Sequence, residues 1–105
     1  ILKKSNEYIP TPDNILDYIS KYYGIEKEII CGQQRVKDAV AARQIAMYLI
    51  RSMTNLPVVE IGKVFDNRDH STVLYSLKQV EKQMKKDPSF AETVKDIKTN
   101  INNRH

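Results

Sequence analysis

The sequence has little of what several classes of protein depend on. Among its 105 residues are one cysteine, three glycines and no tryptophan. A single cysteine, Cys31, cannot form an internal disulfide, so the composition favours a reducing, cytoplasmic compartment over a secreted disulfide-rich domain. No apolar run approaches the ~20 residues that a membrane span needs. The charged segment at residues 1–8 is followed by no apolar core, so we expect no secretory signal.

The same scarcity argues against catalysis. Two histidines and one cysteine provide no metal-ligand spacing, and we interpret Cys31 as a small buried residue and not as a nucleophile. Asp69 and His70 are adjacent, but neighbours on a helix do not face each other. The three glycines stand far apart, so no loop is suited to cradling phosphates. We therefore expect no enzyme activity, metal, ATP or other cofactor in this chain.

The composition predicts one globular domain. Hydrophobic residues make up 41% of the chain and charged residues 29%, and the length is too short for two hydrophobic cores. The chain begins at Ile1 without a methionine, which indicates a fragment of a longer protein. We expect residues 1–10 to be a linker or the end of a connecting helix, residues 11–101 to form the domain, and residues 102–105 to be a tail.

Helical periodicity runs through the first half of the chain. Thr11 and Pro12 form a helix start, and Gly24 is expected to end that helix in a left-handed conformation. The apolar positions of this helix are Ile15, Leu16, Ile19, Tyr22 and Tyr23. Residues 25–30 predict a short buried turn or second small helix. Residues 37–53 give the clearest pattern, with apolar positions at Ala39, Ala42, Ala46, Leu49 and Met53, widened by Val36 and Ile50.

Three more helices are expected in the second half. Residues 57–65 form a short helix in which Gly62 allows close packing, and a second begins at Asp69 or His70 and ends near Lys86. The apolar positions of the second are Val73, Leu77, Val80 and Met84, with Leu74 alongside. A last helix spans residues 90–101 through Val94, Ile97, Lys98 and Ile101. No segment has the period of a strand, so the fold class is all-α, a small helical bundle.

A short helix, a turn and a longer helix form the helix-turn-helix arrangement, which residues 57–86 match. The polar run from Arg68 to Thr72 opens the second helix, where this motif presents side chains to base edges of DNA. The alternative is that Asp69 only caps the helix, which stabilises it by about 1 kcal/mol without any ligand. The two roles are compatible, and the motif alone leaves both open.

Positive charge is concentrated in two segments. The net charge is +4, residues 32–51 hold four basic residues against one acidic residue, and residues 66–86 hold five against three. If these segments share a face, that face attracts a polyanion. Ordinary solvated helix surface is the alternative explanation.

Three ordered segments carry a family resemblance. They are the run from Arg68 to Leu74 (R-D-H-S-T-V-L), the run from Val40 to Leu49 (V-A-A-R-Q-I-A-M-Y-L) and Glu60-Ile61-Gly62. They resemble the C-terminal DNA-binding domain of the bacterial replication initiator DnaA, and the order agrees across about residues 11–100. The resemblance implies a reader of double-stranded DNA at the DnaA boxes of replication origins, which initiates and regulates chromosome replication.

The resemblance also implies roles for individual residues. The helix from about residue 70 would enter the major groove, where Asp69, His70 and Ser71 read bases, while Arg35 enters the adjacent minor groove. Phosphates would be held by Arg43, Gln44, Arg51, Val58, Val59, Arg68, Thr72 and Lys78, with the two valines acting through backbone N–H groups.

The resemblance implies that ATP would bind a separate AAA+ domain preceding Ile1. Apart from the resemblance, acidic phospholipid surfaces are a secondary expectation for a basic face. We expect the isolated domain to be a monomer in the cytoplasm, associated with the nucleoid, with self-assembly left to missing domains. An alternative function is that of a protein-interaction bundle, which would expose apolar residues and bind its partner at high salt. A dimeric transcription repressor is another, although no heptad seam is evident.

The sequence departs from the family pattern at several positions. Asp66-Asn67 replaces the usual Gly-Gly, which predicts a left-handed conformation at Asn67. Ser71 replaces the common threonine and loses a methyl group that could contact thymine. Residues 33–34 are glutamines where several relatives are basic, and at the start of the first motif helix Pro57 replaces a frequent serine cap and Val59 a frequent proline.

Overall fold

The computed structural model describes residues 10–103, and within that range it contains six helices and no strand. The helices are α1 (Pro12–Tyr23), α2 (Lys27–Cys31), α3 (Lys37–Met53), α4 (Val58–Val64), α5 (His70–Lys86) and α6 (Pro88–Asn102). This confirms the all-α prediction. The linker or connecting helix expected at residues 1–10 falls, apart from Pro10, outside the described residues, as do residues 104–105 of the expected tail.

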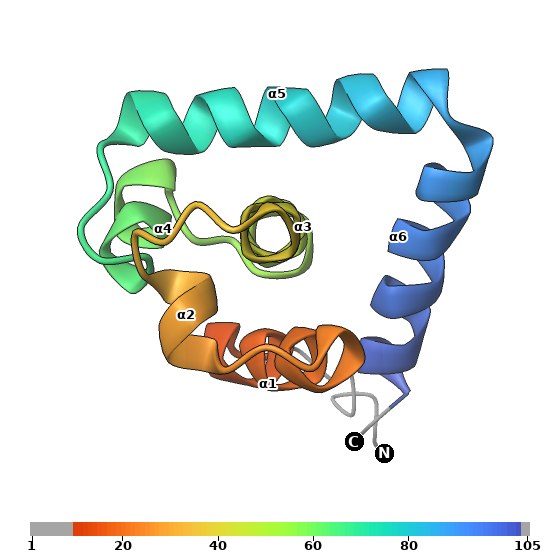
Figure 1. Cartoon of the computed structure of the whole chain (residues 1–105), viewed down its shortest axis with the longest axis horizontal. Helices are drawn as coiled ribbons and strands as arrows, with labels where there is room; N and C mark the ends of the chain where they lie inside the picture. Colours follow the sequence, from red (N-terminus) through yellow and green to blue (C-terminus); the bar gives the residue numbers. More distant parts are fainter. Residues whose placement is uncertain (1–9, 104–105) are drawn as a thin grey trace, which may run out of the picture.

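Helix α3 is the centre of the fold. Figure 1 looks along its axis and shows α1, α5 and α6 around it, with α2 and α4 on the remaining side. The predicted apolar positions Ala39, Ala42, Ala46, Leu49 and Ile50 are buried, and Met53 is half-buried. Ile45 and Met47 are fully buried as well, because other helices surround α3. The spacing of apolar residues in the sequence predicted only one buried side of this helix. The prediction that Val36 belongs to this buried side is wrong, because Val36 precedes the helix and is 60% exposed.

Helix α1 begins and ends as its sequence predicts. The Thr11 hydroxyl accepts from the Asn14 N–H at 3.1 Å, and the Asn14 side chain accepts from the Thr11 N–H at 3.3 Å. These reciprocal bonds satisfy two of the N–H groups that a helix start leaves unpaired. Gly24 follows the helix in the left-handed region at φ 67°. Tyr22, expected in the apolar stripe, is instead half-exposed.

One residue joins α5 to α6. Asp87 follows the last turn of α5, and its carboxylate accepts from the N–H groups of Ser89 and Phe90 to cap α6. Helix α6 therefore begins at Pro88, two residues before the expected start, because proline fits the first helical position without losing a bond. Lys98 is exposed and does not join the apolar side of α6, so its predicted core position is wrong.

No helix among the described residues is both long and apolar enough to cross a membrane.

Candidate nucleic-acid interface

Helices α4 and α5 are held together by a close backbone approach at Gly62. The Gly62 carbonyl accepts from the Arg68 N–H at 2.9 Å. A Cβ atom at Gly62 would lie 2.2 Å from the Arg68 carbonyl oxygen, well inside van der Waals contact. The turn between the helices therefore requires glycine here, which confirms the expected close packing and fixes where α5 begins.

The turn itself contains two successive left-handed residues. Asp66 has φ 62° and Asn67 φ 55°. Asparagine and aspartate enter this region more readily than other side chains, so the pair can replace glycines at modest cost. The predicted conformation of Asn67 is confirmed, and Asp66 shares it. Phe65, fully buried just before them, anchors the turn to the core.

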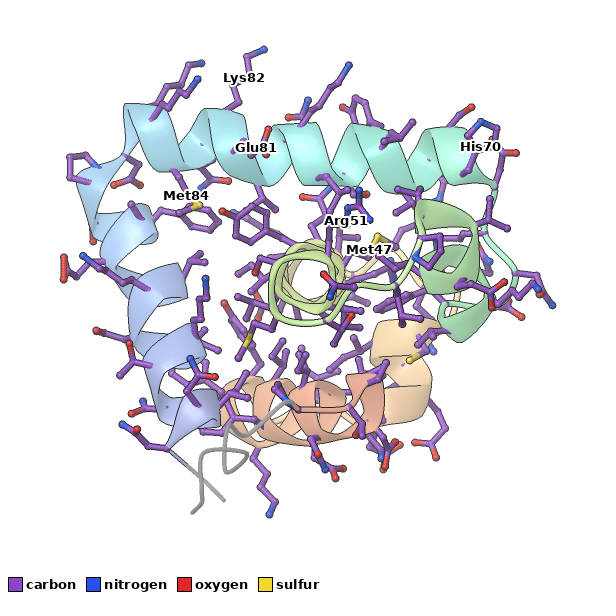
Figure 2. The ribbon with its side chains drawn as sticks, turned by 180° about the vertical axis from the view of Figure 1, so that it is seen from behind. Met47, Arg51, His70, Glu81, Lys82 and Met84 are labelled. Atoms are coloured by element: carbon purple, nitrogen blue, oxygen red, sulfur yellow. The ribbon has the colours of Figure 1, made fainter. Side chains whose placement is uncertain are left out.

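The amino end of α5 exposes a run of polar side chains. Asp69 caps the helix, because its Oδ2 accepts from the Ser71 N–H at 3.1 Å. Its Oδ1 lies 3.9 Å from the His70 Nδ1. Asp69, His70, Ser71 and Thr72 are all exposed, whereas Val73 is fully buried and sets the rotation of the helix. Figure 2 shows His70 at the end of α5, outside the body of the molecule.

A hollow in the surface connects this helix end to the loop before α3. Its lining comes from that loop, from one side of α3 and from the start of α5, and we call it the interface hollow. The lining residues are Gln33, Arg35, Val40, Arg43, Gln44, Asn67, Arg68, Asp69, Thr72, Tyr75 and Ser76. Each of the two positively charged segments thus contributes to this surface, the first with Arg35 and Arg43 and the second with Arg68.

The hollow contains half of the predicted site residues. Arg35, Arg43, Gln44, Arg68, Asp69 and Thr72 line it, and the exposed His70 and Ser71 follow Asp69 on α5. The others are elsewhere: Arg51, Val58, Val59 and Lys78 are not among the lining residues. Arg51, in the last turn of α3, donates to the Leu56 carbonyl at 2.9 Å. Lys78 and Val59 are exposed and Val58 is half-buried.

Arg43 is the most buried of the predicted site residues. It is only 5% exposed, and its guanidinium donates to the carbonyl oxygens of Ile30 at 2.6 Å, Gln34 at 2.9 Å and Ile29 at 3.0 Å. Burial, and then the nearby charge of Arg68, lower the pKa of Arg43 from its ordinary value. Such a side chain has little surface to offer a phosphate, and its phosphate contact stays a prediction.

Arg68 is held in a similar way. Its guanidinium donates to the carbonyl oxygens of Gly32 at 2.7 Å, Phe65 at 2.9 Å and Cys31 at 3.3 Å, and to the Gln33 side-chain oxygen at 3.3 Å. Burial lowers the pKa of Arg68 as well. The sequence marks both residues only as basic, and nothing in their spacing reveals carbonyl partners 9, 13 and 14 positions from Arg43 or 36 and 37 positions from Arg68.

Five residues that line the hollow were not predicted as site residues from the sequence: Gln33, Val40, Asn67, Tyr75 and Ser76. Tyr75 is 60% exposed and lines the hollow, three residues after Thr72 on the same side of α5. The three-residue spacing from Thr72 was the sequence signal that could have placed Tyr75 at the site. Gln33 was noted only as a missing charge, yet its side chain bonds to both Arg68 and Asp66. Leu74, expected beside the core, is instead 41% exposed next to Tyr75.

A family model described as the bacterial dnaA protein helix-turn-helix matches residues 12–80. The chain belongs to the bacterial DnaA family. It is 39% identical over 102 residues to the chromosomal replication initiator protein DnaA of Lachnoclostridium phytofermentans, covering 97% of this chain and 22% of that protein. It is 40% identical over 88 residues to DnaA of Deinococcus radiodurans, covering 84% of this chain and 19% of that protein.

A solved structure supports the same assignment. A crystal structure of a DNA replication initiation factor matches with a TM-score of 0.79 and 29% identity, covering 89% of this chain and 29% of that one. The chain thus spans about a fifth of the length of its curated DnaA relatives. The matched part is their helix-turn-helix segment and not a catalytic domain.

Proposed function

We propose that this domain binds double-stranded DNA sequence-specifically, at the DnaA boxes of a bacterial replication origin, and so takes part in initiating and regulating chromosome replication. The observation that carries the proposal is the exposed polar end of α5, which adjoins a hollow that also contains Arg35. Membership of the DnaA family supports the same function.

In this proposal the amino end of α5 enters the major groove. Asp69 keeps one carboxylate oxygen on the Ser71 N–H and has the other available to accept from a base amino group. His70 and Ser71 project beside it, and Ser71 offers a hydroxyl that can donate and accept. The buried Val73 underneath keeps these side chains facing outward, so they need no rearrangement to meet base edges.

Arg35 provides the second point of base contact. It is exposed, lies in the loop between α2 and α3, and lines the hollow opposite the start of α5. A narrow minor groove concentrates negative potential and attracts an arginine. We propose that Arg35 enters the minor groove next to the major groove that α5 occupies.

Phosphate contacts would hold the domain in register between these two grooves. Gln44 and Thr72 line the hollow, Arg51 and Lys78 carry exposed charges beyond it, and the first N–H groups of α4 belong to Val58 and Val59. These groups carry no sequence information, but together they fix the orientation of the domain on the duplex.

A competition titration tests this function. A labelled duplex containing a DnaA box is bound by the domain and competed with unlabelled box or with a scrambled duplex, at two salt concentrations. We expect the box to compete at least tenfold better, and the affinity for both duplexes to fall as salt rises, because bound phosphates release counterions. Equal competition by both duplexes would refute sequence-specific binding.

The same titration separates the rival functions. A protein-interaction bundle would show no salt-dependent DNA binding, whereas a dimeric repressor would bind two half-sites and sediment as a dimer. We propose a monomer, to be checked by sedimentation without DNA. Binding to acidic phospholipid surfaces, and ATP binding by a preceding domain, stay predictions.

A further inference from the structure

The loop that carries Arg35 is held from two sides by arginines. Arg43 on α3 donates to the carbonyls of Ile29, Ile30 and Gln34. From the helix-turn-helix turn, Arg68 donates to the carbonyls of Cys31 and Gly32. Together they take up five carbonyl groups within residues 29–34. We call this pair, Arg43 and Arg68, the carbonyl clamp.

The clamp donates hydrogen bonds to carbonyl groups at the end of helix α2. A helix leaves its last carbonyl groups without partners inside the helix, and α2 has only five residues. Its N-cap, Glu26, makes no side-chain cap bond, and its last turn has no basic residue of its own. The Gly32 N–H donates to the Ile29 carbonyl, and two guanidinium groups from other elements supply further donors to the end of the helix. They also place positive charge at the negative end of the helix dipole.

The clamp also connects α5 to the loop. The Phe65 carbonyl accepts from Arg68 at 2.9 Å, and Gln33 joins the turn by accepting from Arg68 and donating to Asp66 at 3.2 Å. The Gln34 carbonyl, which Arg43 holds, belongs to the peptide immediately before Arg35. The backbone of Arg35 is therefore tied both to α3 and to the residues that open α5.

We infer that Arg43 and Arg68 are positioning residues, which set the distance between Arg35 and the amino end of α5 and thereby link minor-groove to major-groove contact. The inference rests on the proposed DNA-binding function. It replaces the phosphate contacts expected of these two arginines, because each guanidinium is already engaged by carbonyl oxygens.

Arg68 is the better residue to test, because Arg43 is buried and its loss endangers folding. The variants are Arg68→Lys, Arg68→Gln and Arg35→Ala, with both Arg68 changes also made on Arg35→Ala. Lys78→Ala serves as a control, because it removes an exposed charge outside the clamp. Thermal unfolding of each variant shows that it is folded before its affinity for the box duplex is measured.

The clamp predicts a coupled result. Arg68→Lys and Arg68→Gln should each weaken DNA binding about as much as Arg35→Ala does. In the double variants, each Arg68 change should weaken the binding of Arg35→Ala by less than about a further twofold, since the effects of residues that act together are not additive. Lysine keeps the charge but lacks the planar fork of donors, so it should not rescue. Lys78→Ala should keep its full effect in the Arg35→Ala background.

A phosphate contact predicts the opposite pattern. Arg68→Lys would then bind within about twofold of the wild type, and Arg68→Gln would multiply with Arg35→Ala and lower the salt slope by about one further unit. Either result would overturn the clamp.

Amide hydrogen exchange on the DNA-free domain tests the clamp without the proposed function. In Arg68→Gln we expect the amides of Ile30 and Gly32, whose N–H groups donate to the carbonyls of Glu26 and Ile29, to exchange at least about tenfold faster while the middle of α5 is unchanged, because local opening depends on local bonds. Unchanged exchange would refute the clamp. If the wild-type domain does not bind the box duplex more tightly than the scrambled duplex, the proposed function is refuted. The exchange measurement then still tests the clamp, because it is made without DNA.

Discussion

Helices α3 and α5 have the same length and opposite uses. Each has 17 residues, but α3 buries eight of them and α5 buries four. Figure 1 shows the reason, because α3 has other helices around it whereas α5 lies along one outer edge. Two amphipathic helices of equal length therefore become a scaffold and a candidate interface according to how many neighbours each has.

The comparison extends to the charged residues of the two helices. Arg43 on α3 is 5% exposed and is stabilised by carbonyl partners, whereas Lys82 on α5 points away from the body in Figure 2. A buried charge persists only where hydrogen bonds replace its lost water. Basic residues on α3 can thus be structural, while those on α5 remain available to a ligand.

The largest expected effect lies on α3. Ile45→Ala should lower the free energy of unfolding by about 2–5 kcal/mol, because it leaves a cavity in a core with neighbours on several sides. Urea denaturation measures it. Lys82→Ala on α5 is the matched control and should change stability by less than about 0.5 kcal/mol. Similar losses for both variants would break the distinction between the helices.

Gly62→Ala should cost about 1–3 kcal/mol, because the added methyl group overlaps the Arg68 carbonyl and pushes α4 away from α5. Gly24→Asn is the matched control, since its left-handed backbone suits asparagine and nothing lies within 4 Å of the added atom. Denaturation of the two variants, followed by box binding, measures the difference. A well-tolerated Gly62→Ala would show that the turn relaxes.

Substitutions at the start of α5 should change discrimination more than folding. His70→Ala is expected to reduce discrimination against single-base changes in the box by about 1–3 kcal/mol while leaving unfolding nearly unchanged. Competition with a set of singly substituted duplexes locates the affected base pair. Equal weakening on every duplex would show that His70 positions the domain and does not read sequence.

Asp69 allows its two roles to be separated. Asp69→Asn keeps a good helix cap but changes the group offered to a base, whereas Asp69→Ala also loses about 1 kcal/mol of cap stability. We expect both to relax discrimination and only the alanine variant to unfold at lower urea. If Asp69→Asn discriminates as the wild type does, the residue is only a cap.

The smallest effect should come from Lys78. Lys78→Ala removes one exposed charge from α5 and should lower the slope of log affinity against log salt by about one unit, with little change in stability or discrimination. Binding to box and scrambled duplexes at several salt concentrations measures the slope. An unchanged slope would remove Lys78 from the phosphate contacts.

Local sequence signals predicted the helices well because the structure satisfies them locally. The Thr11 cap, the left-handed Gly24, the bounds of α3 and the start of α5 at His70 after the Asp69 cap depend on residues within one turn of each other. The start of α6 was missed by two residues, although Asp87 and Pro88 carried the signal. Val36, Tyr22 and Leu74 were misplaced because spacing gives a face of a helix but not what covers it.

Local order along the chain is enough to predict the all-α class, the helix-turn-helix, the family and the polar run that opens α5. Which arginines are exposed and which donate to carbonyls depends on how the helices pack. Arg35 and Arg43 look alike in sequence, yet Arg43 packs against residues 13 and 14 positions away, and Arg68 reaches back 36 and 37. The role of a guanidinium depends on the acceptors that the folded backbone brings to it, and no local pattern encodes them.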